Sequence, residues 1–143
     1  MKKKVLITRG VFNEVVAGLS GRFEVEHNAE DRPWPPEELA RRLAGKAAAM
    51  ATVMDRFDEP LLAAAPELKV IANIAVGYNN IDVPACTRRG IRVTNTPGVL
   101  DDTTADLTWA LLMAAARRIA EGDAYVRAGD WKIAFGVQYF LGQ

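Results

Sequence analysis

Short apolar runs recur along the first hundred residues, and segments with helical periodicity separate them. Runs of four to seven residues rich in β-branched and small side chains are typical of buried strands. Strands that alternate with helices form a parallel sheet with helices on both faces. We therefore predict an α/β, flavodoxin-like fold with strand order 2-1-3-4-5. The five predicted strands are residues 4–8, 23–26, 48–54, 68–74 and 91–95, and residues 23–26 are predicted from alternating apolar and polar residues rather than from a continuous run.

Residues with known end preferences mark the predicted helices between these strands. Pro36 suits the first turn of a helix, where its missing N–H costs nothing. Asp58 and Asp82 are candidate N-caps of two further helices. Gly90 follows the last of these helices, where a left-handed C-terminal residue is expected.

A long apolar segment follows the fifth strand. Asp101, Asp102 and Thr103 are candidate N-caps, and acidic residues also suit the positive end of the helix dipole. We predict one helix that continues to residue 128, about 39 Å long, which is enough to leave one domain and enter another. One stripe of apolar residues recurs at four-residue spacing: Leu107, Leu111, Ala115 and Ile119.

The predicted organisation therefore has three parts. Residues 1–101 form the flavodoxin-like domain, residues 102–128 form the long helix, and residues 129–143 form a C-terminal arm. The arm is rich in aromatic and aliphatic residues, which would be unfavourable in water and are more typical of a subunit interface.

The composition excludes several functional classes. The chain has 18 basic and 18 acidic residues, and this balance argues against a nucleic-acid-binding protein. No signal peptide and no segment long enough to cross a membrane is visible. A single cysteine, Cys86, fits a reducing compartment, so we expect a cytoplasmic protein. One histidine, His27, and one cysteine cannot supply a metal cluster, and we expect His27 at the surface.

The loop after the fourth strand carries the candidate chemistry. Gly77 permits backbone angles that other residues resist. Successive N–H groups of Val76 and Gly77 could then bind one anion, for which a carboxylate is the natural candidate. A plain structural turn remains the alternative. Asn79 and Asn80 are expected to shape the turn, and Met54 is expected to fill the core rather than to line the site.

Three linked motifs resemble the D-isomer-specific 2-hydroxyacid dehydrogenase family. They are Ala-Val-Gly-Tyr-Asn-Asn-Ile-Asp at residues 75–82, Arg-Gly-Ile-Arg-Val-Thr-Asn-Thr-Pro-Gly at residues 89–98, and Val-Leu-Asp-Asp-Thr-Thr-Ala-Asp at residues 99–106. The third motif is most similar to the glyoxylate and hydroxypyruvate reductase branch. The resemblance covers essentially the whole chain in order.

The resemblance implies an enzyme that transfers hydride between NAD or NADP and a small 2-oxo or 2-hydroxy acid. It implies that the amides of Val76 and Gly77 bind the substrate carboxylate. It also implies that Thr104 contacts the nicotinamide side of the cofactor, although the Thr104 hydroxyl could equally cap the long helix. The long helix would cross between domains, and the arm would pack on a partner subunit in a homodimer.

The sequence departs from the family in one large respect. No Gly-x-Gly-x-x-Gly motif opens a helix after a strand, so we expect the nucleotide-binding half to be absent from residues 1–143. The catalytic arginine, glutamate and histidine implied by the family cannot be assigned. We predict that these residues alone are inactive and bind no nicotinamide cofactor tightly. A non-catalytic dimerisation or small-acid-binding module is the alternative, whereas Thr8-Arg9-Gly10 argues against a phosphoacceptor receiver or a flavin-binding protein.

Overall fold

The structure is a computed structural model that describes residues 1–132. The chain divides into two compact units, Met1–Pro97 and Gly98–Gln143. The first unit contains a five-stranded sheet, and the described part of the second contains two helices.

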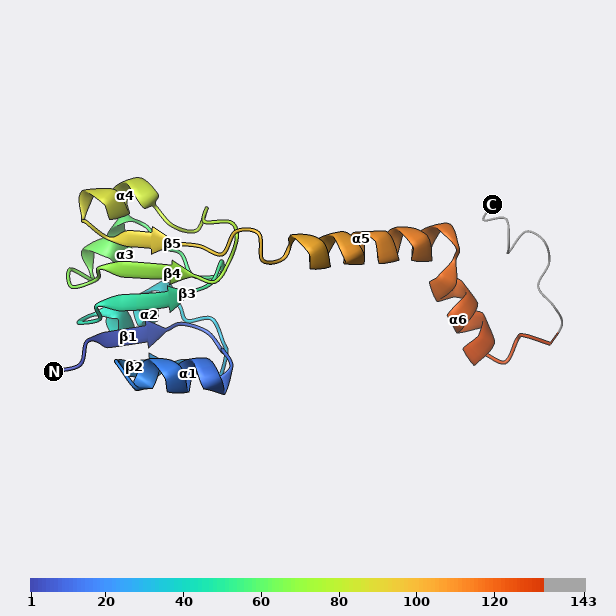
Figure 1. Ribbon diagram of the computed structural model, residues 1–143, viewed down its shortest axis with the longest axis horizontal. Coiled ribbons are helices and arrows are strands. Elements are labelled where there is room, and N and C mark those ends of the chain that lie inside the picture. The colour runs from blue at the N-terminus through green and yellow to red at the C-terminus, as the bar shows by residue number, and fades with distance from the viewer. Residues whose placement is uncertain (133–143) are drawn as a thin grey trace. The chain divides into compact units, whose positions relative to one another are not determined.

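All five strands run parallel in the order β2-β1-β3-β4-β5 (Figure 1), which confirms the predicted fold class. The third strand ends earlier than predicted, because residues 52–55 form a hydrogen-bonded turn. The strands are β1 (Lys4–Ile7), β2 (Glu24–His27), β3 (Ala48–Ala51), β4 (Val70–Asn73) and β5 (Arg92–Thr94). The helices of the first unit are α1 (Asn13–Ser20), α2 (Pro36–Leu43), α3 (Glu59–Ala63) and α4 (Val83–Arg88).

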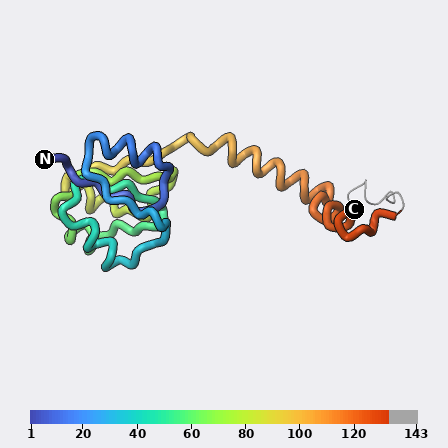
Figure 2. Tube along the Cα trace, turned by 90° about the horizontal axis from the view of Figure 1, so that it is seen from below, coloured from blue at the N-terminus to red at the C-terminus, as the bar shows by residue number. Residues whose placement is uncertain are grey.

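The core lies mainly on one face of the sheet. Helices α2, α3 and α4 each contribute buried residues to one hydrophobic cluster around Phe57, which has no exposed surface. Helix α1 has no buried residue and lies on the other side of the sheet from α2 (Figure 2). Cys86 belongs to the core cluster, and burial raises the pKa of its thiol, as does the nearby Asp82. Cys86 is therefore a packing residue of α4 rather than a nucleophile.

The predicted helix ends of the first unit are confirmed. The Asp58 carboxylate accepts a hydrogen bond of 3.3 Å from the Leu61 amide at the start of α3. The Asp82 carboxylate accepts one of 2.9 Å from the Ala85 amide at the start of α4. Gly90 has a φ of 67°, so it takes the left-handed conformation expected after α4. These caps fix where the loops at the edge of the sheet begin and end.

The second unit begins with α5 (Asp101–Ala116), whose N-cap differs from the prediction. Leu100 occupies the N-cap position, and no side chain caps the helix. Asp101 and Asp102 instead lie in the first turn, where they still suit the helix dipole. The Thr103 hydroxyl donates to the Leu100 carbonyl rather than accepting an orphan N–H.

The prediction of one continuous helix to residue 128 is wrong. Arg118 has φ 53° and ψ 36°, a left-handed conformation that interrupts the right-handed helix. Its amide bonds to Ala115 O, three residues back, which tightens and ends the last turn of α5. A second helix, α6 (Ile119–Arg127), starts at once, and Arg118 Nε donates to Glu121 in its first turn at 2.7 Å. This ion pair gives Arg118 a local partner in the left-handed conformation.

The predicted arm at residues 129–143 lies largely outside the described residues, so its role as an interface stays a prediction. Among residues 1–132, no helix combines the length and the apolar character needed to cross a membrane. The large apolar side chains of α5 are exposed within the chain: Leu107, Trp109, Leu111, Leu112 and Met113.

Candidate carboxylate-binding site

The loop between β4 and α4 carries both residues predicted to bind the carboxylate. Val76 is 42% exposed and Gly77 is also exposed. Within residues 1–132, neither backbone N–H donates a hydrogen bond to the protein. Gly77 does not have a positive φ. The prediction that this position needs backbone angles reserved for glycine is therefore wrong. The two amides are therefore adjacent donors on exposed residues, and they remain candidates for binding one anion.

Three successive carbonyl groups of this loop are held by hydrogen bonds. The carbonyl of Ala75 accepts from the Thr96 amide at 2.8 Å. The carbonyl of Val76 accepts from Asn95 Nδ2, also at 2.8 Å. The carbonyl of Gly77 accepts from Asn73 Nδ2 at 2.9 Å. Asn73, at the end of β4, and Asn95 and Thr96, directly after β5, therefore hold the loop in place through these hydrogen bonds.

Asn80 joins this loop to the loop that follows β3. Its Nδ2 donates to the carbonyls of Thr52 and Asp55, at 3.1 and 3.0 Å. The Asn80 carbonyl accepts from the Phe57 amide at 2.8 Å, beside an isolated parallel bridge between Phe57 and Ile81. Asn80 was expected to shape its own turn, and its side-chain amide in addition bonds across to a second loop. Two loops at the carboxyl edge of the sheet are therefore one hydrogen-bonded unit.

A buried carboxylate anchors the second of these loops to β1. Asp55 is 5% exposed, and its Oδ2 accepts from the Thr8 hydroxyl at 2.6 Å and the Thr52 amide at 2.9 Å. Buried polar groups need such partners, because an unpaired one costs free energy. Hydrogen bonds of Asp55 and of the asparagines Asn73, Asn80 and Asn95 therefore link the ends of β1, β3, β4 and β5.

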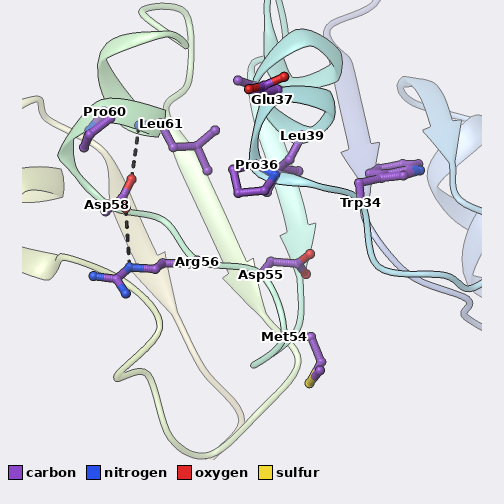
Figure 3. A pocket seen from close by; sticks show the side chains of 11 residues that line it. Trp34, Pro36, Glu37, Leu39, Met54, Asp55, Arg56, Asp58, Pro60 and Leu61 are labelled. Carbon is purple, nitrogen blue, oxygen red and sulfur yellow. Dashed lines mark hydrogen bonds and ion pairs between the residues drawn. The ribbon is translucent and has the colours of Figure 1, made fainter.

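A pocket of about 410 Å³ lies between α2 and α3 (Figure 3). Figure 3 shows the Asp58 carboxylate bonded both to Arg56 and to the start of α3. Met54 lines this pocket and is 64% exposed, so the expectation that it fills the core is wrong. A second hollow, of about 420 Å³, is lined by Asn79 and Asn80 among others. The linings of these two hollows include neither of the candidate amides.

The loop after β1 is where many doubly wound folds bind a phosphate, but here a carboxylate already fills it. Asp31 Oδ1 accepts from the Gly10 amide at 2.7 Å and from Arg9 Nε at 3.0 Å. These bonds, first that of Gly10, lower the pKa of Asp31. A Cβ at Gly10 would lie 2.9 Å from Asp31, so there is no room for a ligand between them. This loop does not fit a dinucleotide pyrophosphate.

Thr104 lies on the exposed surface of α5. Its amide donates to the Leu100 carbonyl, and its own carbonyl accepts from the Thr108 hydroxyl at 2.8 Å. Because no side chain caps α5, the alternative role of Thr104 as a cap is not observed. Its contact with a nicotinamide cofactor stays a prediction.

His27, the single histidine of the chain, does not lie in the loop after β4. His27 ends β2 and is half-buried rather than at the surface, and its Nε2 is buried without a hydrogen-bond partner. Within residues 1–132, no group of three or more histidine, cysteine, aspartate or glutamate side chains could hold a metal ion.

The parallel five-stranded sheet of order β2-β1-β3-β4-β5 defines a flavodoxin-like class of α/β protein. The family model for the catalytic domain of D-isomer specific 2-hydroxyacid dehydrogenases matches residues 5–129. The chain therefore belongs to the D-isomer specific 2-hydroxyacid dehydrogenase family.

Three relatives show how far the similarity extends. The glyoxylate reductase of Thermococcus kodakarensis is 46% identical over 145 residues, which cover 99% of this chain and 44% of that protein. A Polaromonas protein of known structure, classed as a D-isomer specific 2-hydroxyacid dehydrogenase, is 33% identical with a TM-score of 0.87, over 100% of this chain and 45% of that one. An NADPH-dependent glyoxylate/hydroxypyruvate reductase from Sinorhizobium meliloti, solved with NADP and malonate, is 27% identical with a TM-score of 0.75, over 95% and 42%. The chain spans less than half the length of each.

Sequence reasoning missed the residues that hold the loop. Asn73 and Asn95 each end or follow a strand of the sheet, but the sequence gives no register between them. Asp55 follows the predicted strand 48–54, which the structure ends three residues earlier, at Ala51. A polar residue just after each strand was the only available signal, because such residues meet at one edge of a parallel sheet.

Proposed function

We propose that this chain supplies the substrate-carboxylate-binding part of an NAD(P)-dependent D-2-hydroxyacid dehydrogenase. The substrate class is glyoxylate, hydroxypyruvate or a related 2-oxo acid. The observation that carries the proposal is a pair of adjacent exposed residues after β4, Val76 and Gly77, whose amides have no hydrogen-bond partner among residues 1–132. The family and the glyoxylate reductases among its relatives support the proposed substrate class.

The contribution of this chain is to bind and orient the acid. Two N–H groups on one carboxylate give charge-assisted hydrogen bonds, which are stronger than neutral ones. Fixing the carboxylate fixes the neighbouring C2 atom, and orientation of this kind supplies much of the rate in bound reactions. A nicotinamide supplies the hydride when bound. The loop after β1 does not fit its pyrophosphate, so we assign the chain no tight cofactor binding and only a Thr104 contact.

We also propose that the protein is a homodimer in which α5 takes part in the interface. The large apolar side chains of α5 are about half or more exposed: Trp109 is 66% exposed and Leu111 is 61% exposed. A helix with so much exposed apolar surface needs cover from another surface. A second copy of the chain provides that cover by closed symmetry.

Thermal unfolding in the presence of small acids tests the carboxylate-binding function. Oxamate is an unreactive analogue of a 2-oxo acid, and glycolaldehyde resembles glyoxylate without the carboxylate. A ligand at about ten times its Kd stabilises the folded state by about 1.4 kcal/mol. We expect oxamate to raise the Tm of the 143-residue chain and glycolaldehyde to leave it unchanged. Equal effects of the two compounds, or none from oxamate, would contradict carboxylate binding.

An absorbance assay separates binding from catalysis. We expect the purified chain to leave NADH and NADPH unoxidised in the presence of glyoxylate, because its single histidine, His27, ends β2, which is not next to β4 in the sheet. Turnover by the chain alone would show that it is a complete enzyme. Absence of both turnover and oxamate binding would favour a dimerisation module.

A further inference from the structure

The geometry points to Asn95 as the residue that aims the Gly77 N–H, the second of the two proposed carboxylate-binding amides, to the same side of the loop as the first. It is a positioning residue, because it acts on the backbone of the loop and not on the acid. The inference rests on the proposed function, since it explains how the same loop becomes an anion site. It adds a residue from the segment after β5 to a site otherwise formed after β4.

A planar trans peptide carries its C=O and N–H on opposite sides. Residues 1–132 contain no cis peptide bond. The carbonyl of Ala75 and the N–H of Val76 therefore belong to one plane and point in opposite directions. The same holds for the carbonyl of Val76 and the N–H of Gly77. Any bond that fixes one of these carbonyls also fixes the direction of the next N–H.

Both carbonyls are fixed from one side of the loop. Thr96 N donates to the Ala75 carbonyl, and Asn95 Nδ2 donates to the Val76 carbonyl, each at 2.8 Å. The two donors are consecutive residues of one segment, so both carbonyls face that segment. The N–H groups of Val76 and Gly77 therefore both face away from it, which is the arrangement that two donors to one anion require.

The Asn95 side chain is needed because the loop cannot hold this arrangement alone. Gly77 lies in an exposed loop and, as a glycine, has no Cβ. Its backbone can therefore adopt many conformations. The Thr96 amide fixes only the first peptide plane. Asn73 bonds the Gly77 carbonyl at 2.9 Å, which fixes the plane that carries the Tyr78 N–H. The Gly77 N–H itself is directed by Asn95.

Residual dipolar couplings measure the direction of each N–H bond and test this role directly. In the unaltered chain, we expect the Val76 and Gly77 couplings to fit two N–H vectors that point to the same side of the loop. In Asn95→Ala, we expect the Gly77 coupling to change or to average toward zero. The couplings of the strands should stay unchanged in this variant. Asn95→Asp keeps the shape without the donor and gives the same test if the alanine variant does not fold.

Asn79→Ala is the matched control, because Asn79 is an exposed asparagine of the same loop and its side chain makes no hydrogen bond within residues 1–132. We expect this variant to keep the couplings of the unaltered chain. The Kd for oxamate should rise roughly three- to tenfold in Asn95→Ala, and stay unchanged in Asn79→Ala.

The outcomes separate the two claims. An unchanged Gly77 coupling in the Asn95 variants, or divergent Val76 and Gly77 vectors in the unaltered chain, overturns the positioning role. Failure of the unaltered chain to bind oxamate overturns the proposed function, while the couplings still decide whether Asn95 directs the amide. A changed coupling with an unchanged Kd also overturns the inference, because the direction of the amide would then not matter for binding.

Discussion

The hydroxyl of Thr8 donates a 2.6 Å hydrogen bond to the carboxylate of Asp55, across 47 positions of sequence. Thr8 has no exposed surface, and Asp55 is 5% exposed. This bond connects the end of β1 to the loop after β3. That loop is in turn bonded through Asn80 to the loop after β4, so the Thr8–Asp55 contact helps to hold the candidate site in place.

Removal of the Thr8 hydroxyl should destabilise the fold. Thr8→Val leaves the Asp55 carboxylate with one partner fewer in a buried position, at a cost of about 1–3 kcal/mol. Urea unfolding of the variant and of the unaltered chain measures this difference. Thr87→Val is the control, because the Thr87 hydroxyl donates to Val83 O on an exposed helix surface, and its loss should cost little. An equal effect of both substitutions would contradict the role of the buried bond.

The Asp31 carboxylate should give the fold a stability that disappears in acid. Its pKa is lowered by the Gly10 amide and by Arg9. A lowered pKa means that the contribution is present above the ordinary value of 3.8 and is lost as the pH falls through the folded-state pKa. Asp31→Asn should therefore lower the Tm near neutral pH, and the difference should shrink below that value.

Asparagine tolerates the positive φ of 52° at position 31, so the substitution tests the charge rather than the backbone. Glu30→Gln is the control, because the Glu30–Arg32 ion pair is exposed and such pairs contribute little. Thermal unfolding at several pH values measures both variants. A Tm difference for Asp31→Asn that persists unchanged in acid would show that the charge is not its cause.

The proposed dimer depends on the apolar surface of α5. Leu111→Glu places a charge where the proposed interface excludes water, which is expensive when the charge is unpaired. We expect sedimentation to show a dimer for the unaltered chain and a shift toward monomer for this variant. Thr103→Glu adds the same charge in the first turn, where it suits the helix dipole, and should leave the dimer intact. A monomeric unaltered chain would exclude the proposed interface.

Local sequence signals predicted the sheet well, because β1, β3 and β4 are short, largely apolar runs and α3 and α4 begin at clear caps. Asp58, Asp82 and Gly90 act where their side chains or backbone preferences indicated. The same local reasoning failed at Arg118, because a left-handed arginine has no signature that distinguishes it from a helical one. The end of β3 was also misplaced, since the turn at residues 52–55 depends on a bond from Thr8.

The candidate site was predicted only in part, for a related reason. Val76 and Gly77 were proposed from the turn and the resemblance, which are both local, and their role stays a prediction. The contacts that hold their carbonyls, from Asn73 and Asn95, depend on which strands become neighbours and in which register. A single sequence does not contain that register, so these residues became visible only in the folded chain.

The most direct test of carboxylate binding follows the backbone amide signals of the 143-residue chain during a titration with oxamate. The account predicts that the signals of Val76 and Gly77 shift most and saturate with one common Kd, while acetamide, which lacks a carboxylate, shifts neither. Saturable shifts centred on another part of the chain, or no saturable shift at these two amides, would contradict it.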